Sequence, residues 1–540
     1  MSETEKKPTT GGVVVHPMDV EAGTKPAAAP TTITKVMWLA FFIALVSYFS
    51  LTWSKTTNKT LLKPLGTFFQ VDAANMELPT TMLHGFPTVV LGLVAGSLCI
   101  GIGAKWNLVL CLVLAVAGQA CCAFGPLMGP GGYWLFCVGR FLNGAGVGMQ
   151  RAVAHVILKM WFPKDKLSTV FSLLRWGDIW AVALDSAISL VIFNAMTEDT
   201  VLNGKTVKNP TGPSLFVPSL VGTILIAIAL VPSLFFPKHE HETVEREKYH
   251  GQSLLSIIGD SLKQTWHDLL NLPAVWFAMM MWFVFLDVSV TPFLSSNMAV
   301  FTDQYWFDGT NAVVAFFSKV PKYIGLAGFI FGMTLDRFGG RRIVLFAVPV
   351  ALIFVQPDLS LPVGQLPGKY TPGSRTGDFL VAVLIWLIMG VAHFFATACY
   401  FPACGVLATD KRMKSAYGIT TSINALLCSM VPFFVLNKLI KGLVIGHSKS
   451  GITPANNAKF IEIREYANIA FNVASILVAC LIFFKYKSEF NDDVFRKKEE
   501  HETEIQQRMR RASSLEHCGD DVFVATDAID MEGLSDEAEE

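Results

Sequence analysis

The chain has few charged residues for its length, which argues against an ordinary soluble protein. Only 16% of its 540 residues are Asp, Glu, Lys or Arg, whereas a soluble domain carries about 25%. Most of these charges lie in the two tails and in short loops, and they leave long uncharged runs such as residues 216–236. Because about 20 apolar residues in a helix span a bilayer, these runs predict membrane-spanning segments.

Other absences narrow the possible functions. Neither sign of charge is in excess, with 43 Lys and Arg against 43 Asp and Glu, so the composition predicts no nucleic-acid partner. The 10 cysteines fall mainly inside the apolar runs and do not form a secreted disulfide framework. The sequence shows no cleavable signal peptide, nucleophile motif, metal-ligand cluster or phosphate-binding loop. We therefore expect no enzyme activity, no cofactor and no metal.

The apolar runs predict helices rather than barrel strands. They lack the alternation of apolar and polar residues that marks a transmembrane barrel, and only helices or closed barrels satisfy the backbone inside lipid. The predicted spans are residues 34–54, 83–104, 106–126, 132–160, 168–194, 214–236, 273–300, 311–335, 342–356, 378–404, 415–440 and 466–486. The predicted fold class is thus an all-α membrane protein of twelve transmembrane helices in two six-helix halves.

A charged stretch at residues 237–271 divides the predicted helices six and six. It contains an amphipathic segment, residues 254–270, which predicts a helix lying on the membrane surface. Both tails are polar or charged and are predicted to be disordered. The predicted domains are a cytoplasmic tail (1–33), an N-terminal six-helix half (34–236), a cytoplasmic linker (237–272), a C-terminal six-helix half (273–486) and a charged cytoplasmic tail (487–540).

Short loops rich in Lys and Arg predict the orientation, because such loops stay on the cytoplasmic side. Some outer segments carry lysines as well, including Lys55, Lys59 and Lys63, and residues 58–60 (Asn-Lys-Thr) match a glycosylation sequon in the first predicted outer loop. With both termini inside the cytoplasm, the inner loops hold Lys164, Lys166, Arg337, Arg341, Arg342, Lys411, Arg412 and Lys414.

The connection between the eighth and ninth predicted spans combines glycine and charge. Residues 332–342 read GMTLDRFGGRR. Glycine suits a tight turn or a close helix contact, and an Asp near a helix end can pair with a loop Arg and with the dipole of a neighbouring helix. We predict a gating loop whose release lets two helices move, formed by Gly332, Asp336, Arg337, Gly339, Arg341 and Arg342.

The fourth predicted span carries an arginine followed by three glycines. Arg140 precedes Gly144, Gly146 and Gly148. Glycines at this spacing make a groove in which another helix can lie close. An arginine inside an apolar helix is costly and marks a buried role, although helix packing alone is the alternative explanation.

These two motifs, in a six-plus-six arrangement, resemble the major facilitator superfamily. The resemblance implies the major facilitator fold, transport by alternating access, and a role for Arg140 in proton or conformational coupling. The equivalent loop of the first half, residues 96–105, lacks the Asp and Arg, so the gating pattern is asymmetric.

A narrower resemblance rests on five short segments, of which residues 140–141 (RF) in the fourth span are one. Together with residues 86–90 (FPTVV), 161–162 (WF), 170–171 (VF) and 415–424 (SAYGITTSIN), this segment is similar, in matching order, to the branch that contains the lysosomal dipeptide uniporter. This resemblance implies export of dipeptides from lysosomes. The branch places an acidic residue directly after the glycines of helix four, where this chain continues with Met149-Gln150.

Charged residues inside the predicted spans are candidate substrate-binding or coupling residues, because a charge within the bilayer is costly. Arg151 lies on a basic face of the fourth span. Arg175 and Asp178 lie three residues apart in the fifth span, and are therefore neighbours on a helix. Such a pair either faces a cavity or offsets its own burial cost.

The second half carries four further candidates. Asp287 lies in the middle of the seventh span, where it could carry a proton or bind a cationic amine. Lys319 and Lys322 flank a proline in the eighth span and are expected to capture a carboxylate, or else to pair with Asp287. His393 could titrate near neutral pH, or could simply be a packed polar residue.

Because both signs of charge occur inside the spans, we predict a secondary transporter of a small charged or zwitterionic solute, best a dipeptide or amino acid. The expected partners are this solute and the lipid bilayer, with protons and an accessory membrane subunit as further candidates. A lysosomal or other endomembrane location, or the plasma membrane, would suit such a protein. The alternatives are a transporter of another organic ion or a sugar, and a non-transporting receptor or scaffold on the same fold.

Overall fold

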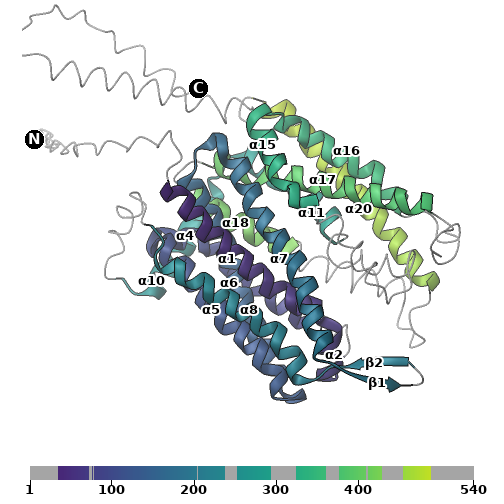
Figure 1. The fold of residues 1–540 in the computed structure, drawn as a ribbon. Helices are drawn as coiled ribbons and strands as arrows, with labels where there is room; N and C mark the ends of the chain where they lie inside the picture. The colour runs from purple at the N-terminus through teal and green to yellow at the C-terminus, as the bar shows by residue number, and fades with distance from the viewer. Residues whose placement is uncertain are drawn as a thin grey trace, which may run out of the picture. The chain divides into compact units, whose positions relative to one another are not determined.

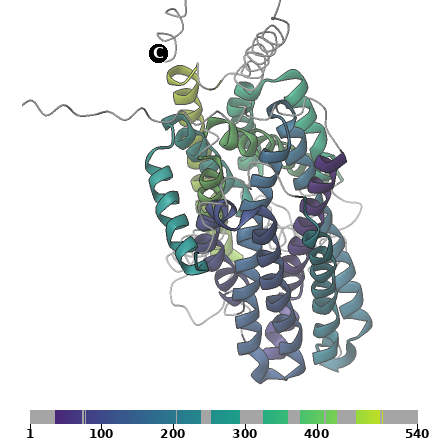
Figure 2. The same ribbon diagram turned by 90° about the vertical axis from the view of Figure 1, so that its left-hand side faces the viewer.

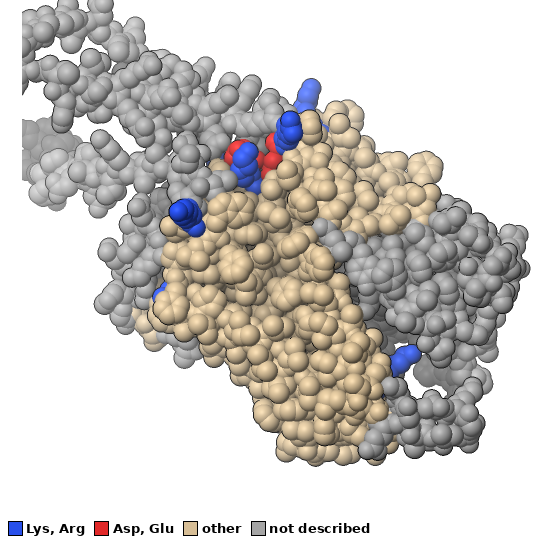
Figure 3. All heavy atoms as spheres, viewed as in Figure 1, with Lys and Arg blue, Asp and Glu red and all other residues tan. Residues whose placement is uncertain are grey.

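The structure is a computed structural model, and it describes residues 35–71, 76, 78–202, 205–237, 252–292, 324–359, 376–408, 412–427, 454–487 and 490. Residues 33–504 form one compact unit, in which long helices run side by side through a bundle (Figure 1). On the face shown in Figure 3, charged side chains gather toward one end and the long side is almost free of charge. Such a surface suits a bundle surrounded by lipid.

Each of the first six predicted spans coincides with a helix. They are α1 (Lys35–Thr60), η1 with α4 (Leu78–Leu83 and His84–Gly101), α5 (Gly103–Leu127), α6 (Tyr133–Trp161), α7 (Leu167–Ala195) and α8 (Gly212–Leu234). Three short helices lie between them: α2 (Leu62–Phe69), η2 (Pro130–Gly132) and η3 (Lys164–Lys166).

The linker segment forms α10 (Leu254–Leu270), and the remaining predicted spans again overlap helices. They are α11 (Ala274–Pro292), η6 with α15 (Ile324–Ala327 and Gly328–Phe338), α16 (Arg341–Leu359), α17 (Thr376–Leu407), α18 (Met413–Ala425) and α20 (Pro454–Lys485). The predicted fold class is therefore confirmed.

Length and hydropathy alone identify fewer of these spans. Among the described residues, 7 helices are long and apolar enough to cross a membrane, or 8 if α10 and α11, bent by 96°, count as one span. α6 is not among them, because Arg140, Asn143, Gln150 and its glycines lower its mean hydropathy. These three side chains are buried against other helices, so the polarity of α6 is not exposed to lipid.

Two helix boundaries and one connection differ from the prediction. α1 continues to Thr60 although its charges predicted an end at residue 54, and α20 begins at Pro454 rather than at residue 466. A small antiparallel hairpin, β1 (Glu198–Leu202) and β2 (Lys205–Asn209), joins α7 to α8 and was not expected. In its register Glu198 lies opposite Asn209, and Leu202 lies opposite Lys205.

The glycines of α6 let two helices approach its backbone, as predicted. A Cβ atom added at Gly144 would lie 2.1 Å from the carbonyl oxygen of His84, and one at Gly148 would lie 2.5 Å from the Cα of Thr88, both on α4. A Cβ at Gly146 would lie 2.4 Å from the carbonyl oxygen of Cys111 on α5. Since any side chain would push α4 or α5 away, these positions fix the packing of the first half.

We call one end of the bundle the linker end: it is the end where α6 joins α7, α15 joins α16 and α17 joins α18. Helices of the two halves meet there at very short range. A Cβ at Gly96 of α4 would lie 1.8 Å from the carbonyl oxygen of Lys414 in α18, and a Cβ at Gly332 of α15 would lie 2.3 Å from that of Ser168 in α7. The bundle is therefore closed at the linker end.

The helix α10 adds to this closure (Figure 2). The hydroxyl of Ser97 in α4 lies 2.6 Å from that of Thr265 in α10 and 3.0 Å from that of Ser415 in α18. Ser415 also donates a hydrogen bond of 2.5 Å to Asp268 of α10. The helix is confirmed, and it packs on α4 and α18 while its other side exposes apolar residues, including 61% of Trp266.

The predicted glycosylation sequon does not lie in an outer loop, and that prediction is wrong. Asn58 is inside α1 and is fully buried. Its side-chain amide donates to the carbonyl oxygen of Ser54 at 3.0 Å and to Oε1 of Gln119 in α5 at 3.2 Å. The amide nitrogen that would carry a glycan is thus used to join α1 to α5.

We expect no glycan at Asn58 and a structural loss when its side chain is removed. The protein is produced in a glycosylating host and treated with a glycosidase that removes N-linked glycans. Its electrophoretic mobility should be the same before and after this treatment. Asn58→Ala should lower the free energy of unfolding by about 1–3 kcal/mol, because Gln119 would lose a buried partner. Thermal unfolding in detergent measures this loss, and a variant as stable as the wild type would contradict it.

Candidate functional site

A cavity of about 440 Å³ opens among seven helices, α1, α4, α6, α7, α11, α17 and α18. Its volume falls in the range of about 300–1,000 Å³ that is usual for small-molecule sites. One face of α1 contributes a large share of the wall, with Tyr48, Thr52, Lys55, Thr56, Lys59 and Thr60. These residues follow the spacing of a single helical face.

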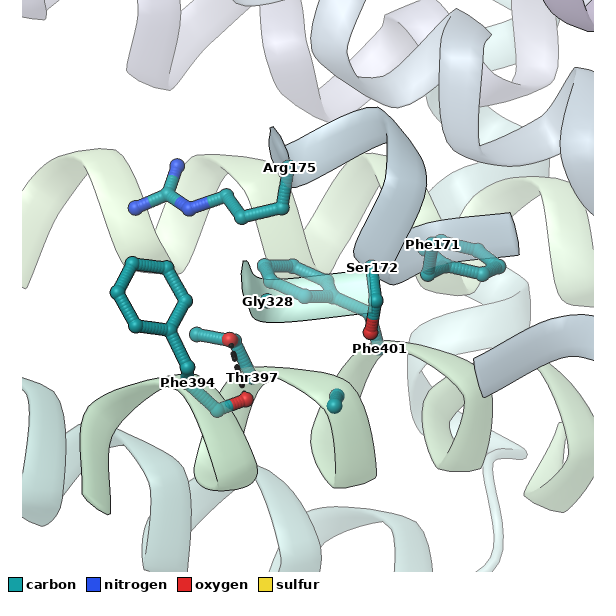
Figure 4. A pocket seen from close by; sticks show the side chains of 8 residues that line it. Phe171, Ser172, Arg175, Gly328, Phe394, Thr397 and Phe401 are labelled. Atoms are coloured by element: carbon teal, nitrogen blue, oxygen red, sulfur yellow. Dashed lines mark hydrogen bonds between the residues drawn. The ribbon is translucent and has the colours of Figure 1, made fainter. Parts of the chain in front are cut away.

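The wall of the first half contains the predicted pair Arg175 and Asp178 on α7. Nη1 of Arg175 lies 2.5 Å from Oδ2 of Asp178, and the hydroxyl of Thr52 on α1 donates to Oδ1 at 2.5 Å. Asp178 is 6% exposed, whereas the Arg175 side chain is 31% exposed. The side chain of Arg175 extends past Phe394 of α17 (Figure 4), so the pair both joins helices and faces the cavity.

The opposite wall carries the predicted residues Asp287 and His393. Asp287 of α11 and His393 of α17 are both buried and line the same cavity, with Nδ1 of His393 3.9 Å from Oδ1 of Asp287. A carboxylate at this depth is costly unless a cation accompanies it. The second half thus places a carboxyl group on the cavity wall, while the first half places the basic side chains Lys55, Arg151 and Arg175 there.

Aromatic rings form the floor of the cavity on the side of the linker end. The ring of His155 in α6 lies 4.7 Å from that of Phe401 in α17, 5.2 Å from that of Phe171 in α7 and 5.6 Å from that of Tyr417 in α18. The rings of Phe171 and Phe401 are stacked. These rings come from both halves, so the path toward the linker end is blocked by apolar contacts that must separate if a solute is to pass.

Beyond this floor, Asp336 joins the two halves at the linker end. Its carboxylate accepts hydrogen bonds from the backbone N–H of Ser168 (3.2 Å) and of Thr169 (2.7 Å), both in the first turn of α7. Nη2 of Arg341 lies 3.0 Å from the same carboxylate and also donates to the hydroxyl of Ser168 at 2.9 Å. Burial raises the pKa of Asp336, and the donors from Thr169, Ser168 and Arg341 oppose that rise. These donors thus offset the cost of a charge at a buried helix start.

The remaining residues of the predicted gating loop have different surroundings. Gly339 and Gly340 have φ angles of 73° and 82°, which favour glycine and make the tight turn between α15 and α16. Arg342 donates to the carbonyl oxygen of Phe490 at 2.7 Å. Arg337 is exposed and lies over the ring of Phe338.

The Major Facilitator Superfamily family model matches residues 37–432, more than half of the chain. The chain belongs to the major facilitator superfamily. This membership makes it a multi-pass membrane transporter, in agreement with the expected absence of enzyme activity.

Two relatives in this superfamily carry the name lysosomal dipeptide transporter MFSD1. The protein of Bos taurus is 21% identical over 413 residues, which are 74% of this chain and 76% of the relative. That of Gallus gallus is 23% identical over 330 residues, 58% of this chain and 64% of the relative.

Solved structures of the superfamily share the fold. The proton:xylose symporter XylE bound to 6-bromo-6-deoxy-D-glucose matches with a TM-score of 0.62 at 13% identity, over 84% of this chain and 96% of that one. The transporter FucP in its outward conformation matches with a TM-score of 0.55 at 15% identity, over 82% and 99% of the two chains. At these identities the likeness concerns the fold of the superfamily alone.

The structure brings together five of the eight predicted binding or coupling residues. Arg151, Arg175, Asp178, Asp287 and His393 all line the cavity. Lys319 and Lys322 lie outside the described residues.

Arg140 lies outside the cavity lining. It is fully buried, and its Nη2 donates to the carbonyl oxygen of Thr80 in η1 at 2.7 Å. In this conformation Arg140 therefore holds the start of the second span, which agrees with the packing explanation.

The cavity lining also contains residues that were not predicted as site residues, among them Lys55, Lys59, His84 and His155. The two lysines were placed in an outer loop, because the first span was ended before them. The spacing of Thr52, Lys55 and Lys59 is that of one helical face and could have indicated that α1 continues with a polar side toward other helices.

Proposed function

We propose that the protein is a secondary transporter for small zwitterionic solutes, with dipeptides and amino acids as its preferred class. The observation that carries the proposal is the cavity itself, in which positive groups on α1, α6 and α7 face Asp287 on α11. A solute with a free amine and a free carboxylate can pair with both walls at once. Such pairing would offset the cost of keeping these charges away from water.

The closure at the linker end supports a carrier mechanism. The gate at Asp336 and the aromatic floor involve both halves, so rearrangement between the halves can close one path and open another. If the predicted orientation holds, the linker end faces the cytoplasm and the cavity here is accessible from the lumen or the exterior. The MFSD1 relatives support a lysosomal or other endomembrane location.

Two alternatives remain distinct from this proposal. A sugar would bind mainly through hydroxyl and amide groups such as Thr421 and Asn424, which also line the cavity. A receptor or scaffold on the same fold would not need charges of both signs in a cavity large enough for a small solute. The charges of the two walls therefore favour a zwitterionic solute over both alternatives.

Counterflow in proteoliposomes tests the proposal with alanylalanine, alanine, xylose and fucose, each with and without a pH gradient. We expect flux of the dipeptide or the amino acid and none of the sugars. An effect of the pH gradient would show proton coupling. Sugar flux without peptide flux would overturn the choice of solute, and no flux of any compound together with a stable partner complex would favour a scaffold.

A further inference from the structure

Lys55 and Arg151 are two basic side chains of the cavity that form no ion pair with a carboxylate among the described residues, although Asp178 lies near enough to act on both. Neither takes part in an ion pair there, whereas Arg175 is paired with Asp178. Lys55 is half-buried on α1, and the guanidinium of Arg151 on α6 lies over the ring of Tyr48 at 6.0 Å. Because a cation inside a membrane protein is costly without a carboxylate in contact with it, such a cluster is suited to receive an anion.

The position of these cations defines a place for that anion. The charged neighbours of Lys55 include Arg151, Lys59 and Asp178. Lys55 lies one turn beyond Thr52, the hydroxyl that binds Asp178, and Lys59 lies about 6 Å farther along α1. The cations thus extend from the level of Asp178 away from the linker end, toward the open part of the cavity.

His84 provides a second, independent indication of a ligand. It begins α4, is only 5% exposed and lines the cavity. Its Nε2 atom has no hydrogen-bond partner in the described part of the chain. A buried polar atom without a partner costs about 1–3 kcal/mol, and a ligand oxygen in the cavity could restore the lost hydrogen bond.

We propose that Lys55 and Arg151, with His84 beside them, form the site that binds the carboxylate of the transported solute. This inference rests on the proposed function and deepens it. The carboxylate lies against the first half, between α1 and α6, and the amine faces Asp287 on the second half. Lys55 therefore takes the role that the sequence had given to Lys319 and Lys322, which lie outside the described residues.

Paired ligands test this assignment on the full-length protein. Alanylalanine and its C-terminal amide have nearly the same shape, but the acid ends in a negative carboxylate and the amide in a neutral group that also donates hydrogen bonds. The wild type should bind the acid about 10–100-fold more tightly than the amide, as expected for a charge-assisted hydrogen bond. Lys55→Gln and Arg151→Gln should each reduce this ratio of affinities by about tenfold or more, mainly because they weaken the binding of the acid. Lys55→Arg keeps the positive charge and should keep most of the preference for the acid.

A matched control removes a charge outside the cavity. Lys63 on α2 is exposed and is not part of the cavity lining, so Lys63→Gln should leave the ratio unchanged. Thermal unfolding of each variant identifies any that fail to fold, and Lys55→Met, which keeps an unbranched apolar side chain without the charge, replaces Lys55→Gln if needed. If the folded Lys55 and Arg151 variants still preferred the acid over the amide as strongly as the wild type, the assignment of the carboxylate site would be wrong. Absence of dipeptide flux in the wild type would instead overturn the proposed function.

Discussion

Asp336→Ala should reduce transport by about 100-fold, because it removes the carboxylate that accepts the backbone N–H groups of Ser168 and Thr169 at the start of α7. Arg341, which is 3% exposed, would then be a buried cation without that partner. Breaking a buried pair in this way costs about 3–5 kcal/mol. Since the cost falls on the state closed at the linker end, the halves should separate there and the carrier should seldom return to the conformation described above.

Distance measurements between spin labels can follow this change directly. Labels at Lys166 and Phe338, both exposed and both at the linker end, should report a longer mean distance in Asp336→Ala than in the wild type. Thr334→Ala is the matched control, because the hydroxyl of Thr334 bonds only within its own helix, to the carbonyl oxygen of Ile330. Identical distance distributions in Asp336→Ala and the wild type would show that this carboxylate does not hold the gate.

Asp287→Asn should weaken the binding of alanylalanine by about 10–100-fold, the usual effect of losing a hydrogen bond to a charged partner. The amide keeps the shape of the side chain but no longer attracts the terminal amine. The affinity for N-acetyl-alanylalanine, which has no amine to lose, should change little. Isothermal titration of the purified protein with both ligands gives the two affinities.

Asp185→Asn provides the control for this substitution. Asp185 is fully buried and lies outside the cavity lining, and it accepts hydrogen bonds from Thr57 at 2.5 Å and from Ser189 at 2.7 Å. Its replacement should lower stability without changing the ratio of the two affinities. If Asp287→Asn weakened both ligands equally, Asp287 would be a structural residue rather than the partner of the amine.

The sequence predicts the helices well because membrane spans depend on a property of single segments. A run of about 20 apolar residues has few alternatives in lipid, and the charged loop around Asp336 and Arg341 is a local pattern. The partners of these residues are not local. Asp178 meets Thr52 and Asp336 meets Thr169 across more than 120 positions of the chain, and no spacing rule connects such pairs.

Lys55 shows a different reason for a missed site residue. Average hydropathy treats all faces of a helix alike, so charges near the end of α1 suggested that the helix had stopped. In the structure the apolar side of α1 continues while its polar side faces a cavity. Arg140 shows a third reason, because its partner is a backbone carbonyl in η1, which no pattern of side chains reveals.

The hydrogen bonds between α1 and α7 have a consequence for inhibition. Thr52 binds Asp178, and Thr57 and Thr60 bind Asp185, so these two helices should move as one body with the cations they carry. Arg151 lies on α6, which packs on α1, and we expect it to move with this body. A carboxylate held by Lys55 and Arg151 then meets the same groups in every state of the cycle, and a ligand shifts an equilibrium only through a difference in its affinity for the two states. The change in binding free energy that favours the next conformation must then come from the interaction of the amine with Asp287. We expect a solute that offers only the carboxylate to occupy the cavity without being carried, and thus to act as a competitive inhibitor.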